Sequence, residues 1–117
     1  MNKRQTGTTY ENAAAEYLIG LGMEEIERNF RTGYGEIDLI MKDGDYTVFV
    51  EVKYRSTGSK GSSLYAVDYR KRMQIIKMAK YYCIKNSLSK IRFDCVGFDG
   101  DKIRYIKNAF DGRGKAW

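Results

Sequence analysis

The chain has 117 residues, of which 43% are hydrophobic, and this is typical of a single domain that buries a sizeable core. Its formal net charge is +6 and it contains no histidine, which excludes histidine-based acid–base catalysis, Ser-His-Asp triads and the usual zinc ligand sets. No apolar run reaches the ~18 residues of a membrane span and no secretory signal is recognisable, so we expect no membrane or secreted protein.

Six helices and strands are expected, because apolar residues recur at helical spacing or alternate as they do in strands. In chain order they are a helix over 8–21, strands over 37–41 and 47–54, a helix over 67–85, and strands over 91–98 and 102–106. Thr8 and Glu11 fit a capping box at the start of the first helix. The ambiguous segment 23–31 can form a turn of helix or an extra short strand near 24–30. The Asp43-Gly44 step is typical of a hairpin turn.

This order of elements predicts an α/β fold with a mixed central sheet and helices packed on its faces. The helix over 67–85 permits a parallel crossover between the hairpin and the strand over 91–98. We expect one domain over residues 1–110, followed by a flexible C-terminal tail over 111–117. Cys83 and Cys95 lie in apolar patterns without CxxC spacing, which predicts buried free thiols and a cytoplasmic location.

Charge is distributed unevenly along the chain. Residues 54–90 contain nine basic residues and one acidic residue, whereas residues 35–53 contain two basic and five acidic residues. An acidic cluster beside a basic segment suits a nucleic acid that is held near a metal site. The alternative is a helix whose lysines only solvate its outer face.

Four charged residues lie within or at the end of the predicted hairpin strands: Glu36, Asp38, Glu51 and Lys53. Because side chains alternate along a strand, an even loop places all four on one face of the sheet. A four-residue loop sets Asp38 opposite Glu51, whereas a two-residue loop over the Asp43-Gly44 step sets Asp38 opposite Phe49.

Directly opposed carboxylates destabilise a sheet unless a cation lies between them. Lys53 can supply one positive charge, and a divalent ion would supply more. Ligands that are all oxygen favour Mg²⁺ or Mn²⁺. The alternative interpretation is a ladder of surface salt bridges, which stabilise a protein little.

The spacing of Asp38 from Glu51-Val52-Lys53 resembles the D…ExK core of the PD-(D/E)xK nucleases, with Ile37 where a proline is usual. Over residues 7–110 the chain more closely resembles the YraN-like family of uncharacterised bacterial proteins, on the segments GEIDLI, VFVEVK and RFD in that order. The resemblance implies a restriction-endonuclease-like single domain, similar to archaeal Holliday-junction resolvases.

The resemblance also implies a set of site residues. Asp38, Glu51 and Lys53 would be catalytic, and the ligands of Mg²⁺ or Mn²⁺ would be Asp38, Glu51, the Val52 carbonyl and Glu11. Glu36 would either hold Lys53 or bind a second metal ion. The side chains expected to contact phosphates of the nucleic acid are those of Arg31, Arg55, Arg70 and Lys71.

The function implied is that of a metal-dependent endonuclease-like phosphodiesterase acting on DNA, including branched or processed DNA. One alternative is a non-catalytic nucleic-acid-binding module on the same fold. Another is an interaction protein whose basic helix is only a solvated face. A homodimer is compatible with the resemblance, because resolvases of this superfamily cut paired strands.

Overall fold

The computed structural model describes residues 3–55 and 67–115. Its elements are, in chain order, α1 (Lys3–Gly20), β1 (Glu24–Thr32), β2 (Gly35–Asp43), β3 (Tyr46–Arg55), α2 (Tyr69–Asn86), β4 (Ile91–Asp99) and β5 (Lys102–Phe110). The predicted mixed α/β domain is confirmed, and the ambiguous segment near 24–30 forms a full strand.

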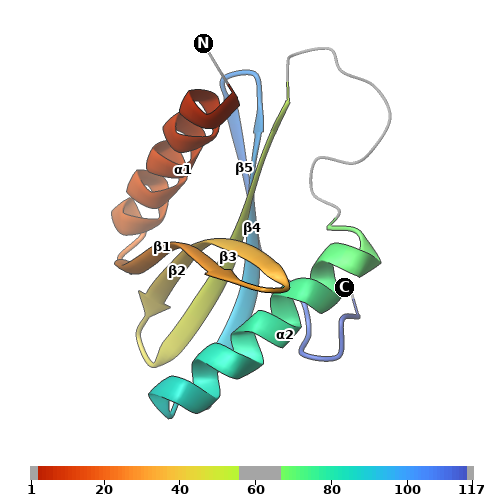
Figure 1. Ribbon diagram of the computed structural model, residues 1–117. Coiled ribbons are helices and arrows are strands. Elements are labelled where there is room, and N and C mark those ends of the chain that lie inside the picture. The colour runs from red at the N-terminus through yellow and green to blue at the C-terminus, as the bar shows by residue number, and fades with distance from the viewer. Residues whose placement is uncertain (1–2, 56–66, 116–117) are drawn as a thin grey trace.

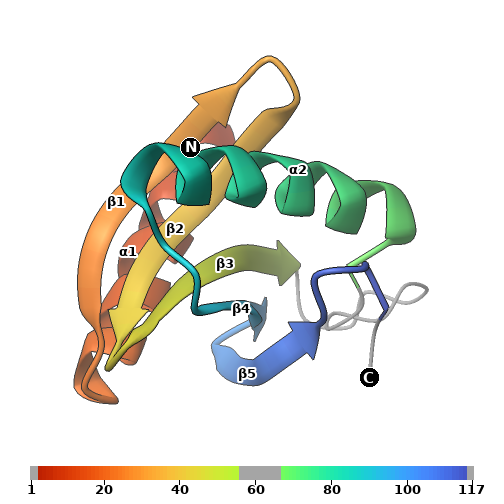
Figure 2. The ribbon, with the colours of Figure 1, turned by 90° about the horizontal axis from the view of Figure 1, so that it is seen from below.

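The five strands form one sheet in the order β1-β2-β3-β4-β5, as Figures 1 and 2 show. The β3–β4 pair is parallel and the other three pairs are antiparallel. Helix α2 is part of the connection between the two parallel strands, as the predicted crossover requires. Among the described helices, none is long and apolar enough to cross a membrane.

Apolar side chains lie on both faces of the sheet, and each face is covered by one helix. The cluster beside α1 comprises Ala14, Ala15, Leu18, Met23, Leu39, Met41, Val48, Val50, Val96 and Phe98. The cluster beside α2 comprises Ile37, Ile40, Phe49, Val67, Ile75, Ile76, Met78, Ala79, Tyr82, Phe93, Cys95 and Phe110. Strand β3 contributes to both clusters, which explains its continuous apolar run and makes any charge at its end costly to bury. Both cysteines are free thiols; Cys95 is buried, whereas Cys83 is only partly so.

The β2–β3 hairpin has the register that sets Asp38 opposite Glu51, but its turn is shorter than the four-residue loop expected for that register. Asp43 and Tyr46 pair with each other, so only two residues form the turn. The first of these, Gly44, has a φ of +61°, a left-handed conformation that glycine adopts without strain.

The predicted capping box at Thr8 and Glu11 is wrong. Helix α1 begins at Lys3, so both residues lie within the helix and neither caps its start. The Glu11 side chain is directed toward the sheet instead, where it meets carboxylates of β2.

A buried ion pair connects β4 with the end of β2 and with β5. Arg92 donates from Nε and Nη2 to the Asp94 carboxylate, each over 3.0 Å, and Nη2 lies 2.9 Å from Asp43 Oδ2. Asp94 also accepts from the Tyr105 hydroxyl over 2.5 Å and from the Asn108 N–H over 2.9 Å, where the β4–β5 register shifts. The RFD segment therefore has a structural role at the edge of the α1 cluster.

Residues 111–115, which belong to the segment predicted as a tail, form a turn beside α2. The Asp111 carboxylate accepts from the backbone N–H groups of Arg113 and Lys115 over 2.8 and 3.0 Å. Arg72 of α2 donates to the Gly114 carbonyl over 2.6 Å, which joins this turn to the start of the helix.

We predict that Asp94→Ala lowers the free energy of unfolding by about 3 kcal/mol, because it leaves the Arg92 guanidinium buried without its bidentate partner. Urea denaturation measures the change. The control is Asp101→Ala in the exposed β4–β5 turn, which we expect to change the same free energy by less than about 0.5 kcal/mol. Equal losses in both variants would contradict the structural role of Asp94.

Candidate functional site

Strands β2 and β3 part at Asp38. Their regular pairing ends at Leu39 and Val50, while β3 continues beside β4 as far as Arg55. Beyond that point the Val52 N–H donates to Asp38 Oδ2 over 2.8 Å, in place of a bond to the backbone of β2. Because a partly buried N–H needs an acceptor, this bond fixes the Asp38 carboxylate in the fork between the two strands.

Glu51 is buried beside Asp38 at the end of the apolar run of β3. It is 9% exposed, and its neighbour on β4 is the buried Cys95. Burial, and after it the charge of Asp38 and a hydrogen bond between the two side chains, together raise the pKa of Glu51 to about 9. At neutral pH Glu51 is therefore protonated and the two carboxyl groups share that proton.

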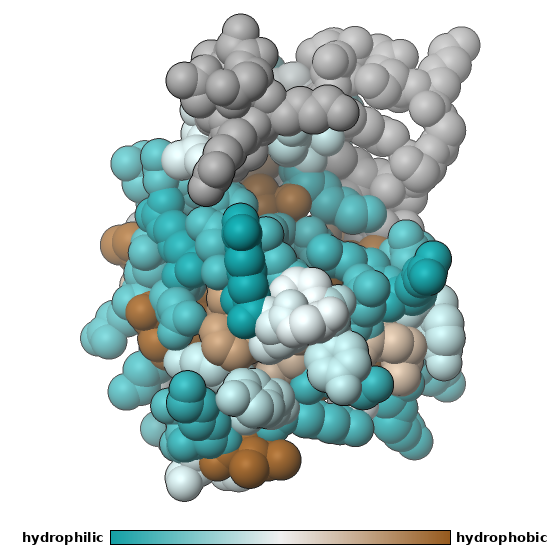
Figure 3. Space-filling view, in the orientation of Figure 1, coloured by the Kyte–Doolittle hydropathy of each residue, from teal (hydrophilic) through white to brown (hydrophobic). Residues whose placement is uncertain are grey.

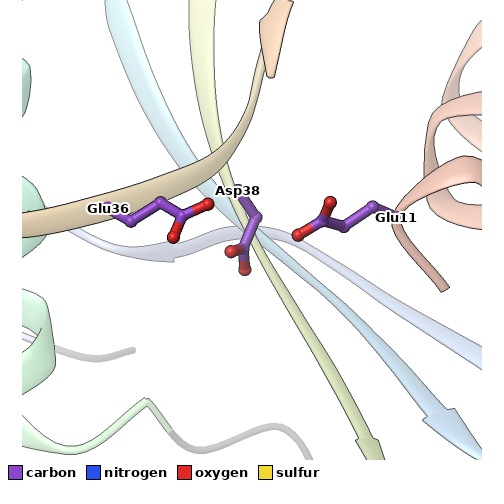
Figure 4. A group of neighbouring side chains, drawn as sticks. All are labelled: Glu11, Glu36 and Asp38. Atoms are coloured by element: carbon purple, nitrogen blue, oxygen red, sulfur yellow. The ribbon is translucent and has the colours of Figure 1, made fainter. Parts of the chain in front are cut away.

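Three carboxylates converge on the other side of the fork, as Figure 4 shows. Glu11 reaches across from α1, and Glu36 and Asp38 extend from β2. Each places one carboxylate oxygen within 4.8 Å of the other two. Partial burial raises the pKa of Glu11, and the charge of Asp38 adds to that effect. Asp38 thus belongs both to this cluster and to the pair with Glu51.

Asn29 of β1 is a site residue that the sequence analysis did not single out. It lies between the register pairs of Arg28 and Phe30, and so stands opposite Asp38, with a left-handed φ of +52°. When its amide nitrogen faces the carboxylates, Asn29 donates to Glu36 and, over 3.2 Å, to Glu11. The sequence feature that could have identified this residue is an asparagine within a strand, because asparagine adopts a left-handed backbone more readily than most residues.

Basic side chains of α2 and of β1 contact the acids. Lys71, in the first turn of α2, places Nζ 3.6 Å from Glu51 Oε2. Arg31 pairs with Glu36 across the β1–β2 ladder, with Nε 3.5 Å from Oε2. Lys53 is half-buried on β3, and its charge, like that of Lys71, opposes the rise in the pKa of Glu51. Cations from three elements therefore flank the acids: Lys71 belongs to α2, Arg31 to β1 and Lys53 to β3.

The structure brings most of the predicted site residues together, but they do not lie in one row along the β2–β3 pair. Seven of them lie around the fork: Glu11, Arg31, Glu36, Asp38, Glu51, Lys53 and Lys71. Val52 contributes its N–H to Asp38. The strand pairing does not extend to Glu36 and Lys53, because β2 leaves β3 before reaching them.

Of the remaining predicted phosphate contacts, one lies away from the fork and the other cannot be placed among the described side chains. Arg70 is exposed on α2 and lines a hollow beside Tyr34. The Arg55 side chain lies outside the described part of the chain.

The donors at the fork fit a divalent cation chemically. They are carboxylate oxygens, which Mg²⁺ and Mn²⁺ prefer, and two of them are close enough to share a proton. A cation bound there would replace that proton, relieving the repulsion that otherwise keeps Glu51 neutral. Glu11, Glu36 and Asp38 each place a carboxylate oxygen within 4.8 Å of the other two, and Glu51 lies beside Asp38, so these are the side chains that could hold such an ion.

Comparisons with known proteins agree along nearly the whole chain. The model described as "Uncharacterised protein family UPF0102" matches residues 10–98. A UPF0102 protein of Lachnoclostridium phytofermentans is 44% identical over 117 residues, covering 97% of this chain and 99% of the relative. One of Fusobacterium nucleatum is 42% identical over 110 residues, covering 92% of each chain. One of Klebsiella pneumoniae is 40% identical over 111 residues, covering 92% of this chain and 87% of the relative.

The buried acid predicts how metal-free stability depends on pH. The folded pKa of Glu51 is raised from 4.5 to about 9, so the folded state keeps a proton that the unfolded chain releases. The contribution of Glu51 to stability is therefore greatest below pH 4.5 and falls as pH rises to about 9, by at most on the order of 6 kcal/mol. Urea denaturation in a chelator across this range measures it.

In the same experiment, Glu51→Gln should flatten the pH dependence and stabilise the metal-free protein at pH 8, because the amide has no charge to bury. The matched control is Glu24→Gln at the exposed start of β1, which should leave the wild-type slope unchanged. A Glu51→Gln variant with the wild-type slope would mean that another group causes it.

Proposed function

The chain belongs to the UPF0102 family, which confirms the YraN-like resemblance, and we propose that it is a metal-dependent nucleic-acid phosphodiesterase of the PD-(D/E)xK superfamily. Its action is endonuclease-like, on DNA that includes branched or processed forms. The proposal assigns its α/β fold to the restriction-endonuclease-like class. The observation that supports it most is the meeting of Glu11, Glu36 and Asp38 at the strand fork, with the buried Glu51 beside Asp38 and cations around them.

The residues that would hold Mg²⁺ or Mn²⁺ are Asp38, Glu51 and the Val52 carbonyl, with Glu11 assisting. When bound, such an ion supplies Lewis-acid polarisation of the scissile phosphate and lowers the pKa of a coordinated water. The Val52 N–H holds the Asp38 carboxylate, so one ligand is oriented before any ion arrives. Asn29 and Arg31 hold Glu36 beside Glu11, which gives Glu36 a supporting place next to the ligands.

The cations have separate tasks in this proposal. Lys53 follows Glu51 by two residues on β3, and it stabilises the negative charge that develops on the phosphate in the transition state. The Lys71 side chain is 35% exposed, so its ammonium can contact a phosphate as well as Glu51. Arg31 is more exposed still and can contact the nucleic-acid backbone at the edge of the site.

A non-catalytic nucleic-acid-binding module is the second candidate. The observation that favours it is the set of exposed basic and aromatic side chains on α2, whose ability to bind would not depend on the acids. Binding and cleavage must therefore be measured separately.

We predict that millimolar Mg²⁺ or Mn²⁺ raises the melting temperature of the wild-type protein and that Glu51→Gln abolishes the rise. A ligand at 100 times its Kd stabilises the folded state by about 2.7 kcal/mol. The apparent affinity should increase with pH, because binding displaces the proton that Asp38 and Glu51 share. Differential scanning fluorimetry at several pH values measures both effects. A rise of equal size in Glu51→Gln would place the ion elsewhere, and Glu24→Gln is the control that should behave like wild type.

We predict divalent-dependent cleavage of at least one substrate in a panel of duplex, single-stranded, flap and four-way DNA, with RNA included. Lys53→Ala should lower the single-turnover rate by about 10²- to 10³-fold, as expected when one charge-stabilising group is removed. Lys42→Ala, at an exposed position near the other end of β2, is the matched control and should cleave at the wild-type rate.

Two outcomes would overturn the nuclease proposal. One is the absence of divalent-dependent cleavage of every substrate by the wild-type protein. The other is an unchanged rate in both Lys53→Ala and Glu51→Gln, which would indicate a contaminating enzyme. Retained binding without cleavage would favour the second candidate.

A further inference from the structure

Tyr34 lies in the turn between β1 and β2, where this hairpin passes over α2. Its side chain is 54% exposed, and Lys77 of α2 places Nζ 4.3 Å from the centre of its ring. This cation–π contact holds the ring against the helix while leaving much of it open to solvent. Figure 2 shows α2 crossing in front of β1 and β2, and in Figure 3 pale and hydrophilic side chains cover the part of the molecule where Figure 1 places the hairpin and α2.

Two hollows share Tyr34 in their lining, and we call the two together the Tyr34 hollows. The first has a volume of ≈ 430 Å³, and its lining includes Tyr34, Tyr81, Arg31 and Lys85. The second has a volume of ≈ 320 Å³, and its lining includes Tyr34, Tyr69, Arg70 and Lys77. Each therefore combines two tyrosines with two cations, and no carboxylate lines either one.

This combination favours unpaired nucleotides over other anionic ligands. Exposed tyrosine rings stack on the faces of bases, and lysine and arginine beside them bind the connecting phosphates. An acidic peptide would use the cations but has no flat rings to stack in both hollows. A continuous duplex presents phosphates, but its bases are already stacked on one another. The three tyrosines are each more than half exposed, which is costly for rings that have no ligand to cover them.

The Tyr34 hollows are joined to the candidate site by the chain itself. The turn that carries Tyr34 leads into β2, and Asp38 follows four residues later, about 13 Å along an extended strand. Arg31 lines the first hollow and also pairs with Glu36. Arg70 of the second hollow precedes Lys71, which contacts Glu51. About four stacked nucleotides would cover this length of surface.

We infer that the Tyr34 hollows bind unpaired bases of a single-stranded segment, so that the substrate is a nucleic acid with a single-stranded region beside the phosphate at the fork. The inference rests on the proposed function for what happens at that phosphate. The binding itself requires no metal ion, and so it can be tested without cleavage.

The test is fluorescence anisotropy in a chelator, with four labelled probes at one salt concentration. The probes are a single strand of about 15 nucleotides, the same sequence as a duplex, an abasic single strand, and an acidic peptide of matched charge. Tyr34→Ala should weaken binding of the single strand by about 5- to 150-fold, the effect of losing one stacked base. Tyr34→Phe keeps the ring and should bind like wild type.

The control variant is Tyr17→Ala, which removes a partly exposed tyrosine from α1. It should leave the affinity for the single strand unchanged, and circular dichroism verifies that every variant is folded. Binding of the duplex and of the abasic strand should not depend on Tyr34. The inference is overturned if Tyr34→Ala binds the single strand as wild type does, or if it weakens the duplex or the abasic strand by the same factor. It is also overturned if the acidic peptide binds as tightly with the same dependence on Tyr34, which would mark a protein-binding surface.

A second variant separates this inference from the nuclease proposal. Asp38→Asn should keep Tyr34-dependent binding of the single strand while losing any cleavage. If no substrate is cleaved by the wild type but binding depends on Tyr34, the nuclease proposal fails and the inference stands. If cleavage occurs and Tyr34→Ala affects neither binding nor rate, the inference fails alone.

Discussion

The hydrogen bond from the Val52 N–H to the Asp38 carboxylate is the interaction on which the rest of the site depends. It satisfies the backbone of β3 where β2 would otherwise continue as its neighbour, and so it allows the two strands to part. The β1–β2 hairpin is then able to cross α2, and the gap admits Glu11 from the opposite helix. It also leaves Glu51 at the end of a buried strand beside a second carboxylate. An ordinary ladder bond at this point would remove the fork and, with it, the meeting of acids from three elements.

The buried acids of the site lower the stability of the folded domain, and the two apolar clusters compensate for this cost. A protonated Glu51 held against Asp38 contributes little to folding, and its ionised form would be destabilising. The two clusters on either face of β3 supply the stabilisation that makes this arrangement tolerable. Farther along the sheet, the Arg92–Asp94 pair is fully matched by hydrogen bonds and carries no such conflict. Two buried sets of charges thus differ, since hydrogen bonds satisfy the Asp94 carboxylate, whereas Asp38 and Glu51 place two carboxyl groups side by side.

Much of the fold follows from sequence patterns, because they report burial. Alternation and helical spacing located both helices and four of the strands, and the crossover gave the parallel pair. Strand β1 was ambiguous, since EEIERNFRT has few β-favouring residues and is held by its pairing with β2 instead. Alternation predicted that Asp38 and Glu51 share one face but left two registers open, and the pairing of Asp43 with Tyr46 selects the one that sets them opposite each other. Alternation could not place Glu36, because counting along strands assumes that they remain paired, and the fork breaks that assumption. The role of Asn29 was hidden for a similar reason, as its left-handed backbone is decided by tertiary contacts.

The single parallel pair in the sheet bears on the order in which the protein folds. Strands β1, β2 and β3 follow one another through short turns and can associate early, whereas β4 must wait until the whole connection containing α2 is in place. Glu51 and Lys53 lie on β3 against β4, so the low-dielectric surroundings of these residues exist only after that slower step. We therefore expect the strands that carry the acids to form before the environment that perturbs them. A nascent meander would present ordinary, water-exposed carboxylates, and the chemical character of the site would emerge last.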